Sequence, residues 1–317
     1  MHLARRTTVI SLESPVDWLW IPITIWAAFA QTIRNAAQKG LTGTLGALGA
    51  TLVRFLYGLP FALLWLFALK AYGGYGWPSL NGAFLMWVCL GAISQIGATA
   101  LLLRVMAERN FALGVAYSKS DVIQSAVFGF VMLGDGLSRG AWIAVVLGTI
   151  GVLLLSPPDR ERPFRALLTG WTTRSALLGL LSGTCFALSA IGFRAAALAL
   201  PDTSFVMGAA VTLAMAQTIQ TLLLGGWLLA RDAGVVVKTF VAWRPSLLAG
   251  GMGAAASIGW FTAMAIEPAA HVRALGMIEL LFSYVVSMRL FRERLSGMER
   301  AGLLLLTIGL VAVALLR

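Results

Sequence analysis

The chain has 317 residues, of which 59% are hydrophobic and only 12% are charged, and its mean hydropathy is +0.86. This composition excludes a soluble globule, because too few polar residues are present to cover the surface of one. The formal net charge of +11 does not indicate a nucleic-acid partner, because the basic residues are scattered at segment ends and form no block of five or more.

Ten mainly apolar stretches follow one another along the chain, each suited to a helix that crosses a hydrocarbon core about 30 Å thick. Short turn and charge signals separate them. We therefore predict an all-α integral membrane protein of the cell (inner) membrane, with ten transmembrane helices. The predicted spans are residues 18–38, 45–70, 82–106, 110–133, 140–156, 174–198, 203–230, 245–266, 269–290 and 297–316.

The first span has some features of a cleaved signal peptide, since Arg5 and Arg6 precede it and it contains Ala28-Phe29-Ala30. We interpret it as a membrane span, because a counterpart begins the second half of the chain. The second span contains Pro60, which is expected to kink it.

Several residues near the span ends are typical of the membrane interface. The tryptophans that are expected to form interface belts are Trp18, Trp20, Trp77, Trp171 and Trp243. The arginines that are expected to extend to the interface are Arg104, Arg109, Arg194 and Arg273. Asp135 and Glu293 lie in predicted loops, where we expect them to cap or pair locally.

The two halves of the chain resemble each other at an offset of 158 residues, which pairs Asp121 with Glu279 and Ser125 with Ser283. This pattern predicts a five-helix unit used twice. Because five is odd, the second unit enters the membrane from the opposite side, as in transporters with a substrate site near the midplane. Chance similarity among apolar helices is the alternative, and the paired acidic residues argue against it. The predicted repeats are residues 18–156 and 174–316, and the linker loop is 157–173.

The ends of the fourth and ninth spans carry related segments, Leu133-Gly134-Asp135-Gly136-Leu137 and Phe291-Arg292-Glu293-Arg294-Leu295. Both resemble the Leu-Gly-Glu-Arg-Leu signature of the EamA repeat, which belongs to the drug/metabolite transporter superfamily. Ile278-Glu279 and Val53-Arg54-Phe55 resemble the family's ninth-helix Leu-Glu and second-helix Leu-Arg-Phe. The resemblance covers nearly the whole chain and implies a ten-helix transporter.

The chain departs from the family at two positions, because Val122 and Leu280 replace the prolines of the fourth and ninth helices. A hinge that depends on those prolines is therefore not expected on the basis of the resemblance.

Asp121 and Glu279 lie near the middle of their spans, where a carboxylate costs about 2.5 to 3.5 kcal/mol on insertion scales. Such a group needs either a partner or a wet cavity. Lys119 lies only two residues from Asp121, about 200° around a helix, so the two cannot pair along one face. Each of them needs a partner on another helix.

We hypothesise that the polar faces of several helices line one central cavity. Asp121 and Glu279 would bind a substrate ammonium group or a coupling proton, and Lys119 or Arg54 would bind a carboxylate or balance charge. The other predicted substrate-binding residues are Tyr117, Gln124, Gln95, Gln31, Asn35, Ser283, Trp260 and Phe261.

A purely structural role is the alternative for each of these residues. Buried ion pairs can hold two helices together, amides and hydroxyls hydrogen-bond between membrane helices, and most mid-span aromatic residues only pack. The sequence leaves both interpretations open.

The distribution of lysines and arginines bears on orientation. Fifteen of them fall on the side reached after odd-numbered spans and seven on the side of the termini, so the positive-inside rule favours both termini outside the cytoplasm. The family resemblance implies the opposite orientation.

Together these features predict a secondary transporter of small metabolites, with amino acids as the expected substrates, that works by alternating access. The family resemblance implies export as the direction. Its expected partners are the substrate, the lipid bilayer and, as a hypothesis, protons, and no metal or cofactor is predicted. The runner-up is a proton-coupled exporter of drugs or organic cations. An ion channel or lipid scramblase could use the same polar faces. An enzyme is not expected, since the chain has only two histidines and no HExxH, GxSxG or paired cysteines.

Overall fold

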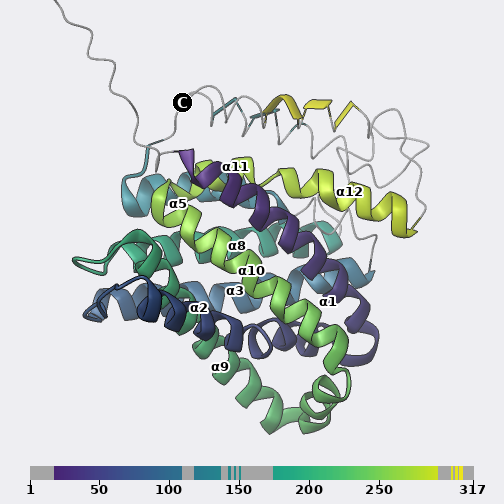
Figure 1. Cartoon of the computed structure of the whole chain (residues 1–317). Coiled ribbons are helices and arrows are strands. Elements are labelled where there is room, and N and C mark those ends of the chain that lie inside the picture. Colours follow the sequence, from purple (N-terminus) through teal and green to yellow (C-terminus); the bar gives the residue numbers. More distant parts are fainter. Residues whose placement is uncertain are drawn as a thin grey trace, which may run out of the picture.

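The computed structural model describes residues 18–108, 118–136 and 174–291, together with single positions within 142–150 and 301–309. The described ranges are helical and contain no strand, which confirms the predicted all-α class for that part of the chain (Figure 1). Six helical stretches among them are long and apolar enough to cross a membrane. Spans 140–156 and 297–316, and the start of span 110–133, fall largely outside the described residues.

The first helix, α1 (Trp20–Leu56), contains both the first predicted span and the start of the second. It folds back on itself at Gly46, whose φ of 67° and ψ of 175° favour glycine. The Gln38 side chain donates to the Ala50 carbonyl oxygen at 2.7 Å. A straight helix would place these two residues about 18 Å apart, so α1 forms two legs that lie side by side.

A second break separates α1 from α2 (Leu59–Tyr72), just before Pro60. Proline lacks the N–H that a helix interior needs but fits the first turn of a new helix, which is where Pro60 lies. Helix α10 (Trp243–Ile266) packs closely against this break. A Cβ atom on Gly250 would lie 2.3 Å from the Cβ atom of Tyr57, so only glycine permits this approach.

Helices α3 (Gly82–Glu108) and α8 (Arg174–Leu198) pack along each other, as do α1 and α10. Asn81 connects the first two, because its side chain accepts from the Phe84 N–H at 2.8 Å and donates to the Ala199 carbonyl at 2.7 Å. The long helix α9 (Phe205–Val241) begins at a Ser204 cap and bends at Asp232, two residues beyond the predicted end of span 203–230.

The predicted span 269–290 is interrupted rather than continuous. Helix α11 (Ala269–Leu275) ends at Gly276, and α12 (Ile278–Phe291) begins two residues later. Helix α5 (Asp121–Leu133) also begins at an interruption, since residues 119 and 120 form a turn rather than helix. Helix α11 contacts α5, and α12 packs against α1 (Figure 1).

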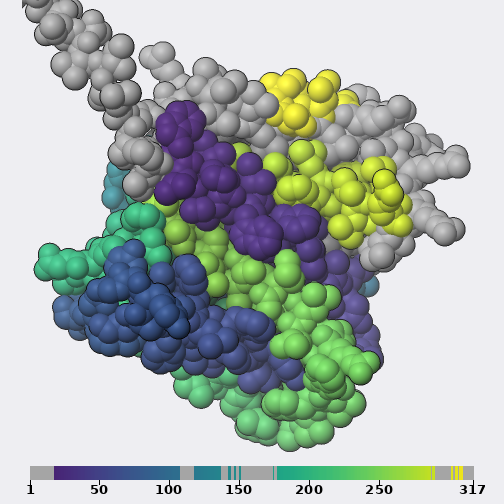
Figure 2. Space-filling view, viewed as in Figure 1, coloured from purple at the N-terminus to yellow at the C-terminus, as the bar shows by residue number. Residues whose placement is uncertain are grey.

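Polar and apolar residues are distributed as a lipid environment requires. Arg34, Gln38 and Thr24 are completely buried, whereas Leu64 is 66% exposed and Val131 is 72% exposed. On the face of the molecule that Figure 2 shows, α1 packs against α10 and α12, and α2 packs against α10. A buried polar interior with an apolar exterior fits a protein embedded in a membrane.

Candidate functional site

A buried hydrogen-bond network surrounds Glu279, in the first turn of α12. The Glu279 carboxylate is 1% exposed and accepts from the side-chain amides of Gln31 at 2.7 Å and Asn35 at 2.8 Å. It also forms an ion pair with Lys119, which lies in the turn before α5. This single carboxylate therefore ties α1, α12 and the start of α5 together.

A second ion pair joins Asp121 of α5 to Arg273 of α11. Arg273 Nη1 lies 3.3 Å from Asp121 Oδ2, and Arg273 Nη2 donates to the Phe186 carbonyl oxygen at 3.4 Å. The Arg273 guanidinium also lies over two aromatic rings, 5.7 Å from the Phe186 centroid and 5.3 Å from that of Trp260. A cation over an aromatic face is stabilised by the ring quadrupole, so Arg273 is held on three sides.

Both acidic residues follow an interruption in a helix. Near α12, tightened bonds link Met277 N–H to the Ala274 carbonyl and Glu279 N–H to the Gly276 carbonyl. Near α5, the Val122 N–H bonds the Lys119 carbonyl in the same three-residue pattern. Interrupted helices free polar backbone groups and are tolerated at membrane depth where protein or a cavity covers them.

Two more arginines, Arg34 and Arg54, are buried in the same region, on the two legs of α1. Arg34 donates twice to the Asn35 side-chain oxygen, at 3.2 and 2.7 Å, and Arg54 donates to the Thr99 hydroxyl at 2.9 Å. Their aliphatic stems are adjacent, because a Cβ atom on Gly253 would lie 3.2 Å from Arg34 Cδ and 3.3 Å from Arg54 Cγ. Among the described residues, both side chains donate hydrogen bonds only to neutral groups.

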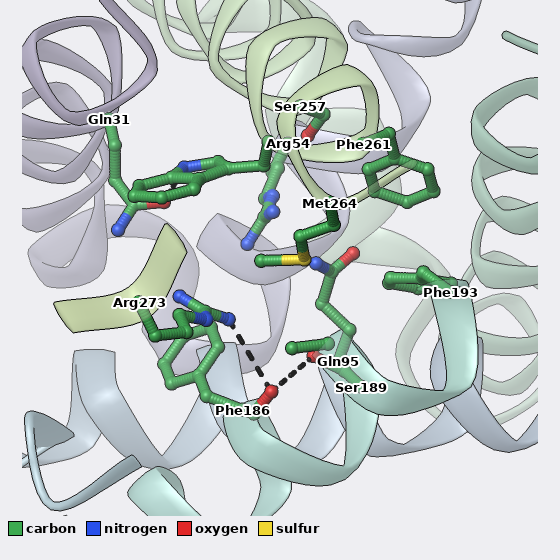
Figure 3. Close-up of a pocket in the computed structure, with 12 residues that line it drawn as sticks. Gln31, Arg54, Gln95, Phe186, Ser189, Phe193, Ser257, Phe261, Met264 and Arg273 are labelled. Atoms are coloured by element: carbon green, nitrogen blue, oxygen red, sulfur yellow. Dashed lines mark hydrogen bonds between the residues drawn. The ribbon is translucent and has the colours of Figure 1, made fainter. Parts of the chain in front are cut away.

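A small cavity lies among these groups, between α1, α3, α8, α10 and α11 (Figure 3). Its volume is about 20 Å³, which is room for the centre of about one water molecule. Its walls combine guanidinium, amide, hydroxyl, aromatic and thioether groups. The lining residues are Gln31, Arg54, Gln95, Phe186, Ser189, Ala190, Phe193, Ser257, Trp260, Phe261, Met264 and Arg273.

Five of the residues that the sequence analysis placed in the site line this cavity, namely Gln31, Arg54, Gln95, Trp260 and Phe261. The Trp260 indole N–H donates to the Gln31 side-chain oxygen at 2.9 Å. Gln95 accepts from Gln220 at 2.9 Å, so the amide is oriented by α9. Phe261 stacks on Phe193 with ring centroids 4.4 Å apart.

Other predicted residues lie behind or away from the lining. Asp121, Glu279, Lys119 and Asn35 form the layer of ion pairs and hydrogen bonds behind it. Gln124 donates to the Ser120 hydroxyl, in the turn before its own helix, at 3.2 Å, and Ser283 is fully buried without a hydrogen bond among the described residues. Tyr117 lies outside the described residues, as do Glu293, Arg109 and Trp171.

The structure corrects three expectations about charged and aromatic residues near span ends. Arg273 and Arg194 do not reach outward from the protein, because both are buried, 7% and 9% exposed, and bind partners within it. Asp135 does not pair locally, since its partner is Arg194, 59 residues away. Trp20 is 1% exposed and packs in the core rather than in an interface belt.

Sequence reasoning missed Arg273, Phe186, Phe193 and Ser189 as parts of the site. The available signal was that Arg273 lies inside an apolar stretch with Gly276 close behind it, where a helix can end within the membrane. Among the described residues, no group of three or more histidine, cysteine or acidic side chains could hold a metal ion.

Comparisons with known proteins give a fold but no family. No family model matches this sequence, and no curated protein matches it. A search of solved structures finds a chain described as "Crystal structure of protein", with a TM-score of 0.67 and 15% sequence identity. The match covers 94% of this chain and 96% of that chain, so the two share a fold over nearly their whole lengths.

Proposed function

We propose that the protein is a secondary transporter, which moves small carboxylate-bearing metabolites, amino acids among them, across the cell membrane by alternating access. The observation that carries this proposal is the buried set of four cations and two carboxylates around the central cavity. Charged groups inside a membrane are costly and are kept mainly where a pathway for substrates or ions uses them. The EamA-like segments of the sequence imply export as the direction.

The proposal includes ten transmembrane helices in two inverted five-helix repeats, residues 18–156 and 174–316. The positions of the two helix interruptions support it. The turn residues 119–120 before α5 and 276–277 before α12 are 157 residues apart, within one residue of the 158-residue offset of the sequence repeat. Transporters of this architecture bind substrate near the midplane, beside discontinuous helices that come from equivalent positions in the two halves.

The size of the cavity supports a carrier rather than an open pore. A cavity of about 20 Å³ holds about one water molecule, so a metabolite enters only after the helices move apart. We interpret this conformation as occluded. Alternating access requires such a state between the conformations that open to each side of the membrane.

An exporter of organic cations has less support as the alternative. Both buried carboxylates already have cationic partners, Lys119 for Glu279 and Arg273 for Asp121. A cationic drug would have to displace one of these partners while the lining arginines repelled it.

Transport by purified protein in liposomes tests the proposal. The substrates are radiolabelled amino acids, with organic cations beside them, and the measurements are saturation and counterflow. We expect saturable uptake that is accelerated by unlabelled substrate trapped inside the vesicles. Linear flux without counterflow would identify a pore, and absence of flux for every compound would contradict the proposal.

Two variants connect that flux to the site. Glu279→Gln removes one buried carboxylate and is expected to lower the initial rate at least tenfold. Asp202→Asn removes an exposed carboxylate at a position with φ of 50°, which asparagine tolerates, and is expected to leave the rate unchanged. Equal rates in both variants would show that the buried carboxylate serves only the scaffold.

A further inference from the structure

The charge of the cavity lining is one-sided. Among the described residues, Arg54 and Arg273 line the cavity and no carboxylate does. Figure 3 shows their guanidinium groups on one side of the pocket, with Phe193 and Phe261 on the other. A ligand in this site therefore meets positive charge at one end and an aromatic surface at the other.

The charges behind the lining leave part of this positive charge uncompensated. Lys119 pairs with Glu279, and Arg273 pairs with Asp121. Arg34 and Arg54 remain, and they bond only an amide oxygen and a hydroxyl, respectively. Within the described residues, the buried cluster thus holds two more cations than anions.

Neutral partners do not offset a buried charge. A guanidinium has five N–H donors and cannot lose its proton in a protein. Leaving a buried charge without its oppositely charged partner costs about 3 to 5 kcal/mol. Arg54 Nε and Arg34 Nη1 have no hydrogen-bond partner among the described residues. Both arginines are at most 2% exposed, so bulk solvent does not screen them.

A carboxylate is the group that matches this arrangement. It carries the missing negative charge, and its two oxygens fit the parallel N–H groups of an arginine. The Arg54 charge is repelled by those of Arg34 and Arg273, and Glu279, which is already paired with Lys119, opposes this repulsion less strongly. An anion at the Arg54 end of the cavity offsets the remaining repulsion.

The opposite wall selects the body of the ligand. Phe193 and Phe261 stack on each other, and Met264 lies between them and the arginines in Figure 3. Aromatic and thioether surfaces bind apolar groups and adapt to their shape. The lining offers no described acidic group that would bind an ammonium.

We propose that the substrate is a small organic anion with an apolar or aromatic body, whose carboxylate binds Arg54 while Arg273 lies beside it. An amino group on the substrate is then unnecessary. This inference rests on the proposed transport function and narrows it from metabolites with a carboxylate, amino acids included, to compounds with net negative charge.

Four compounds with the same benzene ring test the charge preference. They are 3-phenylpropionate (anion), phenylalanine (zwitterion), 3-phenylpropanamide (neutral) and 2-phenylethylamine (cation). Binding to the purified full chain is measured in detergent by the rise in melting temperature and by competition, because ligands that bind the native state stabilise it. We expect the anion to bind at least tenfold more tightly than phenylalanine, and the neutral and cationic compounds to bind most weakly.

Variants at Arg54 test the assigned contact. Arg54→Gln is expected to weaken binding of 3-phenylpropionate by about 10- to 100-fold, as for loss of a hydrogen bond to a charged group. Arg54→Lys keeps the charge and should recover part of the affinity. Arg244→Gln, at an exposed arginine in the first turn of α10, is the matched control and should bind like the parent.

The melting temperature of the ligand-free protein shows whether Arg54 serves ligand binding or only holds the helices together. Arg54→Gln removes an uncompensated cation, so the melting temperature should stay equal or rise. An arginine that only holds the helices together would lower it on replacement. If Arg54→Gln does not fold, that result itself contradicts the proposal.

Different results would overturn the anion preference and the transport function. Tighter binding of phenylalanine or 2-phenylethylamine than of 3-phenylpropionate overturns the anion preference and leaves transport standing. Saturable amino-acid flux in liposomes without any binding of 3-phenylpropionate would likewise overturn the anion preference and leave the transport function standing. Absence of both flux and binding for all compounds overturns the transport function as well.

Discussion

Lys119 and Glu279 form a buried ion pair although 160 residues separate them in the sequence. The same carboxylate accepts two amide hydrogen bonds from α1, so Glu279 has three partners and almost no exposure. Because all of these partners bind one buried carboxylate, the ion pair fixes the position of α12 relative to the turn before α5. Removing one partner leaves the other charge buried and uncompensated.

We therefore expect Glu279→Gln to destabilise the protein by about 3 to 5 kcal/mol, the usual cost of breaking a buried pair. The double variant Lys119→Met with Glu279→Gln removes both charges and should regain most of that loss. Melting temperatures in detergent for the four members of this cycle give the coupling. If the double variant is no more stable than Glu279→Gln alone, the two charges do not depend on each other.

Proton coupling leads to a separate prediction at Asp121 and Glu279. If these carboxylates exchange protons during the cycle, a pH gradient across a liposome should change the initial rate of substrate uptake. Glu279→Gln cannot take up a proton at that position, so its remaining flux should be indifferent to the gradient while counterflow persists. A parent protein that ignores the gradient is a facilitator, and the carboxylates then have no role in coupling.

The positions of the helices could be predicted because hydrophobicity is a local property of the sequence. The predicted spans 82–106, 174–198 and 245–266 agree closely with α3, α8 and α10. The turn within α1 at Gly46 and the bend of α9 at Asp232 are harder to place, because each depends on a single residue with non-helical backbone angles inside an apolar stretch.

The partners of the buried charges could be predicted only in part. Helical spacing excludes a simple pair between Lys119 and Asp121, and in the structure each has its own partner. Which partner it is depends on helix packing that spacing does not encode. Arg273 shows the limit clearly, because its partners Asp121 and Phe186 come from α5 and α8, far from it in the sequence.

Arg194 gives a prediction at one end of the bundle. Its guanidinium bonds both oxygens of Asp135, at 3.0 and 3.2 Å, and the carbonyl oxygens of Met264 and Glu267, at 2.7 and 2.8 Å. The two carbonyls lie at the end of α10, where helix carbonyls lack intrahelical partners and carry partial negative charge. One side chain thus connects α8, the end of α5 and the end of α10.

Arg194→Gln should lower the melting temperature more than Asp135→Asn does. Arg194→Gln leaves the Asp135 carboxylate and two carbonyl oxygens without their guanidinium partner. Asp135→Asn leaves the carbonyl bonds intact and affects a side chain that is 18% exposed. Arg194→Lys should lie between them, because an ammonium keeps the charge but not the paired geometry. Equal losses for Arg194→Gln and Asp135→Asn, with a smaller loss for Arg194→Lys, would show that the ion pair, rather than the carbonyl contacts, accounts for the effect.

Gly183 of α8 gives the last prediction, because it packs directly against the interruption that positions Lys119 and Asp121. A Cβ atom there would lie 2.3 Å from Ser120 Oγ, 3.0 Å from the Ser118 carbonyl oxygen and 3.1 Å from the Asp121 nitrogen. The Ser120 side chain can rotate away, but the two backbone atoms can move only if the whole turn moves. Small residues of this kind let membrane helices approach each other closely.

We expect Gly183→Ala to displace this turn and to lower transport and thermal stability together, although alanine favours helix by about 1 kcal/mol over glycine. Gly226→Ala in α9 is the matched control, because its added Cβ would meet no atom within 4 Å, and it should be neutral or slightly stabilising. Melting temperature and counterflow rate are measured for both. If Gly183→Ala transports like Gly226→Ala, the turn tolerates displacement, and the position of Lys119 and Asp121 does not limit the transport cycle.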